Sequence, residues 1–193
     1  MRTLLNVTKR FYIYLITLNE KEKLMKKLVI IALICIVASK ICIVASSAYA
    51  ESKPFQLSLT PGIAIHSEET FIKGVTLNIW GENPQAAFAF GFVNGSSGNS
   101  AGFSWGLVNY AENYTGVEWG TVNYAKGNFK GLQSGFFNYA GKLKGLQFGA
   151  INYAKTVESG LQIGLVNIIE QNKWFTGFPK ELAKGMVFVN WRF

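Results

Sequence analysis

Few residues in this 193-residue chain can do acid-base, nucleophilic or metal chemistry. The sequence contains no aspartate, a single histidine, His66, and two cysteines, Cys35 and Cys42. Catalytic triads, thiolate metal centres and paired-acid sites each need several such groups close together. We therefore predict no catalytic, metal-binding or cofactor-binding residue, and we do not expect an enzyme.

Basic charge is concentrated in the first 50 residues, which hold eight of the 19 Lys and Arg side chains and two of the 11 acidic ones. In the rest of the chain the two signs nearly balance, so it has no basic surface of the kind that binds nucleic acid. Both cysteines also lie in the first 50 residues. We therefore expect neither nucleic acid as a partner nor disulfides in residues 51–193.

The first 50 residues read as a leader. Two lysines after Met25 precede an apolar run from Leu28 to Val37, and the segment ends in Ala48-Tyr49-Ala50. This order of charged, apolar and small residues is typical of a cleaved secretory signal. We predict a leader over 1–50 with its signal core at 25–50, removed on export; an uncleaved membrane helix is the alternative, and the start is either Met1 or Met25.

Residues 51–193 are dominated by a repeat of 14 or 15 residues. Five copies read GFSWGLVNYA, GVEWGTVNYA, GLQSGFFNYA, GLQFGAINYA and GLQIGLVNII, and a degenerate copy, AFAFGFVNG, precedes them. Repeated units of this length bury a continuous core only when neighbouring copies pack together. We predict one repeat-built β-domain over 51–193, with the repeats at 87–169.

Each copy alternates between two kinds of side chain, which is typical of a β-strand with two different faces. Two glycines per copy also disfavour a helix, at a cost of about 1 kcal/mol each. The bulky apolar face includes Phe103, Trp105, Trp119, Phe136, Phe148 and Ile163. The small face carries glycines and one polar residue per copy, which is Ser104, Glu118, Gln133, Gln147 or Gln162.

The segments between the copies alternate between five and six residues, which favours two kinds of turn at the two ends of antiparallel strands. Further alternating segments lie at 55–60, 75–80 and 187–193. The all-β pattern predicts a small up-and-down antiparallel β-barrel of about 8–10 strands, its polar face toward the lumen and its bulky face toward lipid. Glu118 would then either bias a channel toward cations or join a hydrogen-bonded polar plug.

A second fold, the β-solenoid, is favoured by an asparagine at one position of every copy. Stacked copies would turn these residues into ladders of like side chains. A solenoid with one copy per coil is expected to have a uniform repeat length, and one with two copies would have about 29 residues per coil. Its bulky face would bind a partner instead of lipid.

Two parts of the chain resemble known bacterial proteins. The C-terminal segment GMVFVNWRF resembles the signature strand of outer-membrane β-barrel proteins, which implies that Trp191 and Phe193 are recognised by the outer-membrane assembly machinery. The copies over 87–169 resemble small surface-repeat proteins built of glycine-rich GLQxGLVN units, although Ala87, Ala89 and Ile168 depart from that pattern. The second resemblance implies a location at the cell surface.

Two hypotheses about function follow. The first is a small surface protein of the outer membrane, embedded in its lipid, with a structural role or a narrow passive pore. The alternative is an exported β-solenoid, periplasmic or attached to the cell surface, that binds a protein or glycan through its repeated aromatic face.

Overall fold

The computed structural model describes residues 52–174 and 179–193. Contacts divide the chain into two units, residues 1–40 and 41–193, and every described residue belongs to the second unit. The predicted signal segment, both cysteines and Glu51 lie outside the described residues.

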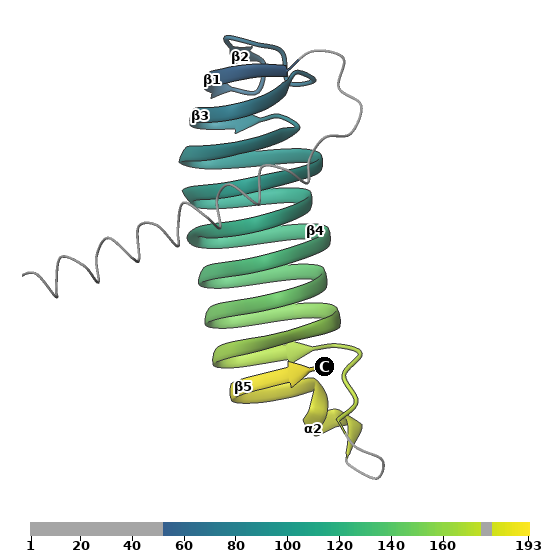
Figure 1. Cartoon of the computed structure of the whole chain (residues 1–193). Helices are drawn as coiled ribbons and strands as arrows, with labels where there is room; N and C mark the ends of the chain where they lie inside the picture. Colours follow the sequence, from purple (N-terminus) through teal and green to yellow (C-terminus); the bar gives the residue numbers. More distant parts are fainter. Residues whose placement is uncertain (1–51, 175–178) are drawn as a thin grey trace, which may run out of the picture. The chain divides into compact units, whose positions relative to one another are not determined.

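The described part of the chain is almost entirely β-structure, as predicted. Its elements are β1 (Ser52–Thr60), β2 (Ile63–Ala64), β3 (Phe71–Glu82), β4 (Gln85–Ile169), α2 (Lys180–Lys184) and β5 (Gly185–Arg192). The 85 residues of β4 wind as one continuous ribbon through successive turns (Figure 1). All the strands belong to one open sheet with the order β2-β1-β3-β4-β5.

The sheet is mixed. β1 pairs with β3 and β3 pairs with β4 in parallel, whereas β2 and β5 pair antiparallel with β1 and β4. Parallel neighbours require the chain to return to the same end of the sheet before each new strand, instead of reversing through a tight turn. The all-β prediction is confirmed, but the small closed antiparallel barrel is not, because the sheet is open and two of its pairings are parallel.

Residues 14 or 15 positions apart in β4 lie side by side. The amide of Asn109 donates to Asn123, that of Asn123 to Asn138, and that of Asn138 to Asn152, each over 2.8 Å. Equivalent residues of consecutive copies are therefore direct neighbours on adjacent turns of the ribbon. The length of the repeat therefore sets the register between adjacent turns.

The segments between the copies are strands, so their prediction as turns was wrong. All five lie within β4, and the last four each supply one large buried apolar side chain, namely Tyr114, Phe129, Leu143 or Val157. With the alanines that follow the Asn-Tyr pairs and with Ile169, these side chains form the apolar core cluster. Each turn of the ribbon therefore has two sides, and the core lies between them.

Two sets of glycines are required by close packing between adjacent turns. A Cβ on Gly149 would lie 1.8 Å from the carbonyl oxygen of Gly135, which is far inside van der Waals contact. Gly131 has a φ of +135°, a conformation that side-chain-bearing residues rarely adopt. The two glycines of each copy are thus conditions for stacking.

Additional structure covers both ends of the ribbon. At the N-terminal end the side chain of Asn83 donates to the carbonyls of Ser67 and Thr70, which ties the loop before β3 to the sheet. At the C-terminal end Asn172, which follows β4, donates to Asn190 of β5 over 3.0 Å. Such caps protect the terminal units of repeat folds.

Gly149→Ala is expected to lower the free energy of unfolding by about 3 kcal/mol or more, because the added methyl overlaps the backbone of the neighbouring turn. Gly62→Ala is the matched control, since a Cβ there meets no atom within 4 Å and should change stability by less than about 0.5 kcal/mol. Denaturant unfolding of both variants measures the difference. Equal, small losses would contradict the close stacking of consecutive turns.

Candidate interaction surface

The asparagines form a ladder through the interior. Seven of them are linked, each Nδ2 donating to the Oδ1 of the next asparagine along the chain over 2.8–3.0 Å, in the order Asn78, Asn94, Asn109, Asn123, Asn138, Asn152 and Asn167. Several also donate their second hydrogen to a backbone carbonyl on the next turn, as Asn152 does to Ile163 over 2.9 Å. The ladder thus satisfies buried amide groups that would otherwise destabilise the interior.

A second ladder runs in the opposite direction. Gln162 donates to Gln147 and Gln147 to Gln133, both over 2.7 Å, and Gln133 donates to a carboxyl oxygen of Glu118 over 2.8 Å. Each glutamine also donates to a carbonyl six residues later on its own turn. Glu118 therefore ends the ladder as an acceptor, and at the other end the Oε1 of Gln162 has no partner among the described residues.

The five residues expected on the small face are all buried. Ser104 shares a 2.9 Å hydrogen bond with the hydroxyl of Tyr114, and Glu118 is only 1% exposed. Burial raises the pKa of Glu118 to about 8, and the hydrogen bond from Gln133 offsets only part of that effect. Burial also raises the pKa of Tyr114. Glu118 is accordingly protonated in the folded chain at neutral pH.

The bulky residues point outward and form three parallel rows, which we call the apolar face. The first row is Phe55, Val75, Phe88, Phe103, Val117, Leu132, Leu146, Leu161 and Trp191; the middle row is Leu57, Leu77, Phe90, Trp105, Trp119, Ser134, Phe148, Ile163 and Val189; the third is Leu59, Ile79, Phe92, Leu107, Thr121, Phe136, Ala150, Leu165 and Val187. No charged residue stands in any of these rows.

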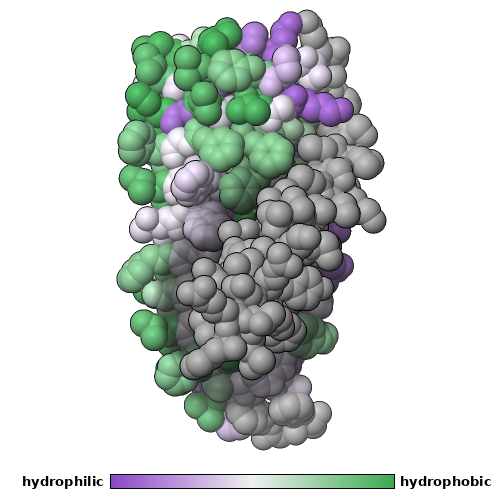
Figure 2. All heavy atoms as spheres, turned by 60° about the vertical axis from the view of Figure 1, so that its left-hand side comes forward, coloured by the Kyte–Doolittle hydropathy of each residue, from purple (hydrophilic) through white to green (hydrophobic). Residues whose placement is uncertain are grey.

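Much of the apolar face is open to solvent. Trp105 is 58% exposed and Phe136 is 62% exposed, and Trp119 and Phe148 are similar. Phe103 and Ile163 are half-buried because neighbouring rings and strands flank them, as Phe88 does Phe103 at a ring distance of 6.4 Å. Figure 2 shows hydrophobic side chains along one side of the ribbon from end to end. Soluble monomers seldom expose an apolar patch of this extent.

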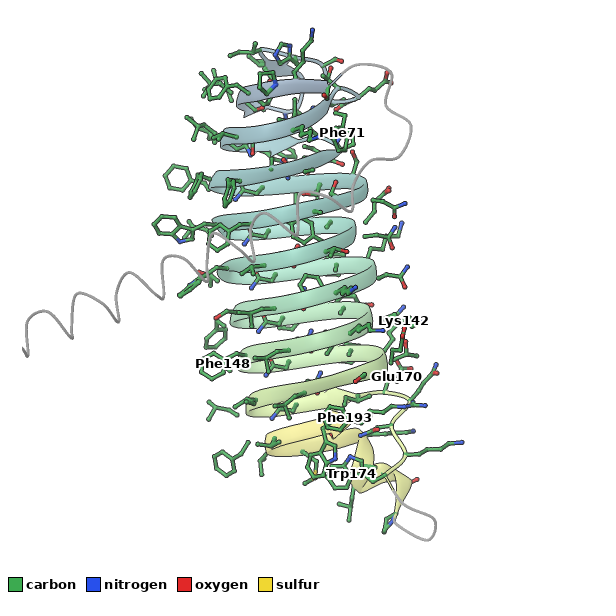
Figure 3. The ribbon with its side chains drawn as sticks, in the orientation of Figure 1. Phe71, Lys142, Phe148, Glu170, Trp174 and Phe193 are labelled. Carbon is green, nitrogen blue, oxygen red and sulfur yellow. The ribbon has the colours of Figure 1, made fainter. Side chains whose placement is uncertain are left out.

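The opposite side of the ribbon is polar and basic. Lys142 and Glu170 point away from the side that carries Phe148 (Figure 3). Along its margin the rings of Tyr124, Tyr139 and Tyr153 stack at 4.6 and 5.4 Å. The hydrogen bond from Tyr153 to Glu170 raises the pKa of that tyrosine to about 12. The two sides of the ribbon therefore differ sharply in character.

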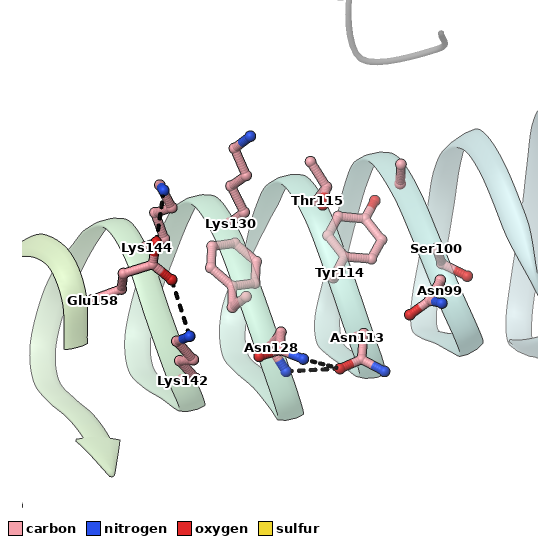
Figure 4. A pocket seen from close by; sticks show the side chains of 12 residues that line it. Asn99, Ser100, Asn113, Tyr114, Thr115, Asn128, Lys130, Lys142, Lys144 and Glu158 are labelled. Atoms are coloured by element: carbon pink, nitrogen blue, oxygen red, sulfur yellow. Dashed lines mark hydrogen bonds and ion pairs between the residues drawn. The ribbon is translucent and has the colours of Figure 1, made fainter. Parts of the chain in front are cut away.

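A depression of about 430 Å³ lies on this polar side (Figure 4). Its one carboxylate, Glu158, contacts Lys142 at 3.0 Å and Lys144 at 2.8 Å, and these lysines lower the pKa of Glu158 to about 2. A carboxylate held ionised by two cations is a poor general base. The depression also has amide side chains from Asn113 and Asn128, and it offers no evident catalytic pair.

The two C-terminal residues expected to be an assembly signal have different surroundings. Trp191 pairs with Leu161 at the last turn of β4 and stacks on Trp174 at 4.6 Å. Phe193 is 85% exposed at the end of the chain. Their recognition by an assembly machinery stays a prediction.

The described residues form neither a metal cluster nor a membrane-spanning helix. Among the described residues, no group of three or more His, Cys, Asp or Glu side chains is placed to hold a metal ion. Within that same part of the chain, no helix has the length and hydrophobicity needed to span a membrane. Comparison with protein-family models, curated proteins and solved structures found no match for this chain.

The inward row of Tyr114, Phe129, Leu143 and Val157 was missed in the sequence. These residues lie in segments rich in Gly, Asn and Lys, which are typical of turns. The available signal was their own recurrence, because one large apolar residue appears in each of the last four such segments at a spacing of 14 or 15 residues. A turn that merely reverses the chain has no need of such a residue.

Glu118→Gln is expected to remove a pH dependence of stability. Because burial raises the pKa of Glu118 from its ordinary value of 4.5 to about 8, wild-type stability should fall as pH rises between these two values, by roughly 5 kcal/mol at most. The glutamine variant should lack this fall and exceed the wild type above pH 8.

Denaturant unfolding from pH 4 to 9 measures the effect, and the quantity compared is the difference between wild type and variant. Glu181→Gln, which removes an exposed carboxylate in α2, is the control and should leave the wild-type curve unchanged. A wild-type stability that rises with pH relative to Glu118→Gln would contradict the burial of a protonated Glu118.

Proposed function

We propose that residues 52–193 form a β-solenoid with one repeat copy per coil, and that this solenoid is an exported binding module. Its interaction surface is the apolar face. The observation that carries the proposal is the combination of a hydrogen-bonded, filled interior with an uncharged outward face along the whole ribbon.

Three features support the solenoid. Parallel pairing joins β1, β3 and β4, amide ladders link residues 14 or 15 positions apart, and an apolar core cluster lies between the two sides of each turn. The alternation between 14 and 15 residues is compatible with one copy per coil, because the extra residue is accommodated on the polar side. One example is the step from Ala125 to Phe129, which is one residue longer than that from Ala111 to Tyr114.

A pore has less support. A conducting lumen needs water beside its polar lining. Glu118, Gln133 and Gln147 are instead buried and hydrogen-bonded to one another, which corresponds to a polar plug. Their ladder serves stability, and it leaves the outward side of the ribbon as the surface available for binding.

A binding role explains why the apolar face is exposed. Water-exposed aromatic rows favour aggregation unless something covers them, so a chain that keeps them uninterrupted over many copies benefits from a binding partner. Export is supported by the predicted signal segment and by the resemblance to surface-repeat proteins. The proposed role is structural and adhesive, without catalysis.

The solenoid predicts opposite effects of arginine at two neighbouring residues. Gln162→Arg should lower the free energy of unfolding by about 3 kcal/mol or more, since the glutamine is fully buried and hydrogen-bonded to Gln147. Ile163→Arg should cost about 1 kcal/mol or less, because Ile163 faces outward and is only half-buried. The folded fraction in denaturant measures both, and a larger loss for Ile163→Arg would favour a lipid-facing barrel instead.

Binding through the apolar face predicts that a partner shields it. In hydroxyl-radical footprinting of the protein on intact cells, Trp105 and Trp119 should be oxidised several-fold less than their exposure in the isolated chain implies. Tyr124, which is also exposed but lies at the margin of the polar side, is the internal control. Unprotected tryptophans on cells would argue against this function.

A further inference from the structure

We propose that the apolar face binds a second copy of this chain, giving a twofold dimer in which two such faces pack together. This inference rests on the proposed function, and it names the partner of the same surface. Three observations carry it: the area of the face, the position of the charges, and the distribution of large and small residues along the three rows.

The area matches what a stable dimer buries. Adjacent turns of a β-ribbon are about 4.8 Å apart, so the eight steps between the nine residues of each row span about 40 Å, and the rows with their side chains are about 18 Å wide. The face therefore offers roughly 700 Å² per copy. Specific protein interfaces bury about 800 Å² per partner, and those of permanent homodimers are predominantly apolar.

The charges favour another copy over a lipid surface. Proteins that rest an apolar surface on a membrane usually place lysines or arginines beside it, where they meet anionic headgroups. Here no charged residue stands in the three rows. Exposed Lys142 points away from the side that carries Phe148 (Figure 3), and exposed Lys126 and Lys155 lie in the corresponding segments between the copies. On a membrane these lysines would point away from the lipid, whereas in a dimer they would remain in water.

The sizes of the residues in the three rows fit a twofold axis that is parallel to the strands and passes through the middle turn. About this axis the order of the turns is reversed. Each turn of one copy therefore lies opposite the turn of the other copy that is equally far from the middle turn but on its other side. Trp119, at the middle of the central row, then meets Trp119 of the second copy. Trp105 meets Ser134, and in the third row Phe92 meets Ala150. At these last two pairs a large side chain faces a small one, which allows two sheets about 10 Å apart to interdigitate there.

Sedimentation equilibrium of the exported protein, purified without detergent, tests the dimer. The wild type is expected to have twice the mass of one chain at micromolar concentration. Trp119→Arg brings two arginines together on the axis and should raise the dimer dissociation constant at least about 100-fold. Thr115→Arg adds the same charge on the opposite side and should leave the constant unchanged.

A compensating pair makes the test independent of the stability of Trp119→Arg. Ser134→Trp alone sets a tryptophan against Trp105 and should weaken the dimer at least about tenfold. Adding Trp105→Ser exchanges the large and small positions across the axis and should restore most of the affinity. Circular dichroism and thermal unfolding verify that the variants are folded. A dimer indifferent to Trp119→Arg, or a double variant weaker than Ser134→Trp, overturns the proposal.

A monomeric wild type also overturns the dimer, and flotation with phosphatidylcholine and phosphatidylglycerol vesicles then separates the two claims. A monomer that floats with vesicles, and loses this binding in Trp119→Arg, would keep the apolar face as a binding surface with lipid as its partner. A monomer that does not float would count against both the dimer and the proposed function.

Discussion

The structure depends on the need to satisfy polar groups inside a narrow ribbon. Each turn brings an asparagine amide, and often a glutamine, into an interior where an unpaired amide would cost about 1–3 kcal/mol. The same amides on the adjacent turns, together with nearby backbone carbonyls, supply the partners. The hydrogen bond from Asn123 to Asn138, repeated turn after turn, therefore couples the length of the repeat to the stacking of the chain.

This coupling explains the other regularities of the sequence. Close stacking leaves no space for a Cβ at Gly135 or Gly149, and it aligns Tyr139 with Tyr153 on the margin. It also aligns the outward residues into rows, so that one apolar position per copy becomes a continuous apolar strip. The continuity of the apolar face is thus a direct consequence of repetition. Binding can influence only which residues occupy it.

The β-structure and its two faces could be predicted because a period of two has the same meaning in any sheet. The direction of pairing could not, because alternation within GLQIGLVN is identical in parallel and antiparallel strands. The choice depended on the intervening segments, where Phe129 and Leu143 identify a second strand and Gly, Asn and Lys imitate a turn. The outward position of Trp105 could be predicted from alternation. The binding partner of Trp105 could not, because it depends on the shape and charge of the whole apolar face.

Each copy lies directly beside the next, in parallel and in register. Glu112 and Lys126 are equivalent residues of consecutive copies, both exposed on the polar side, and residues 51–193 contain no native cysteine. Spin labels on cysteines introduced at these two positions should therefore show strong dipolar broadening, as expected for neighbouring strands about 4.8 Å apart. A separation near 30 Å, the length of a membrane-crossing strand of 9–11 residues, would place the two positions at opposite ends of antiparallel strands and contradict the account.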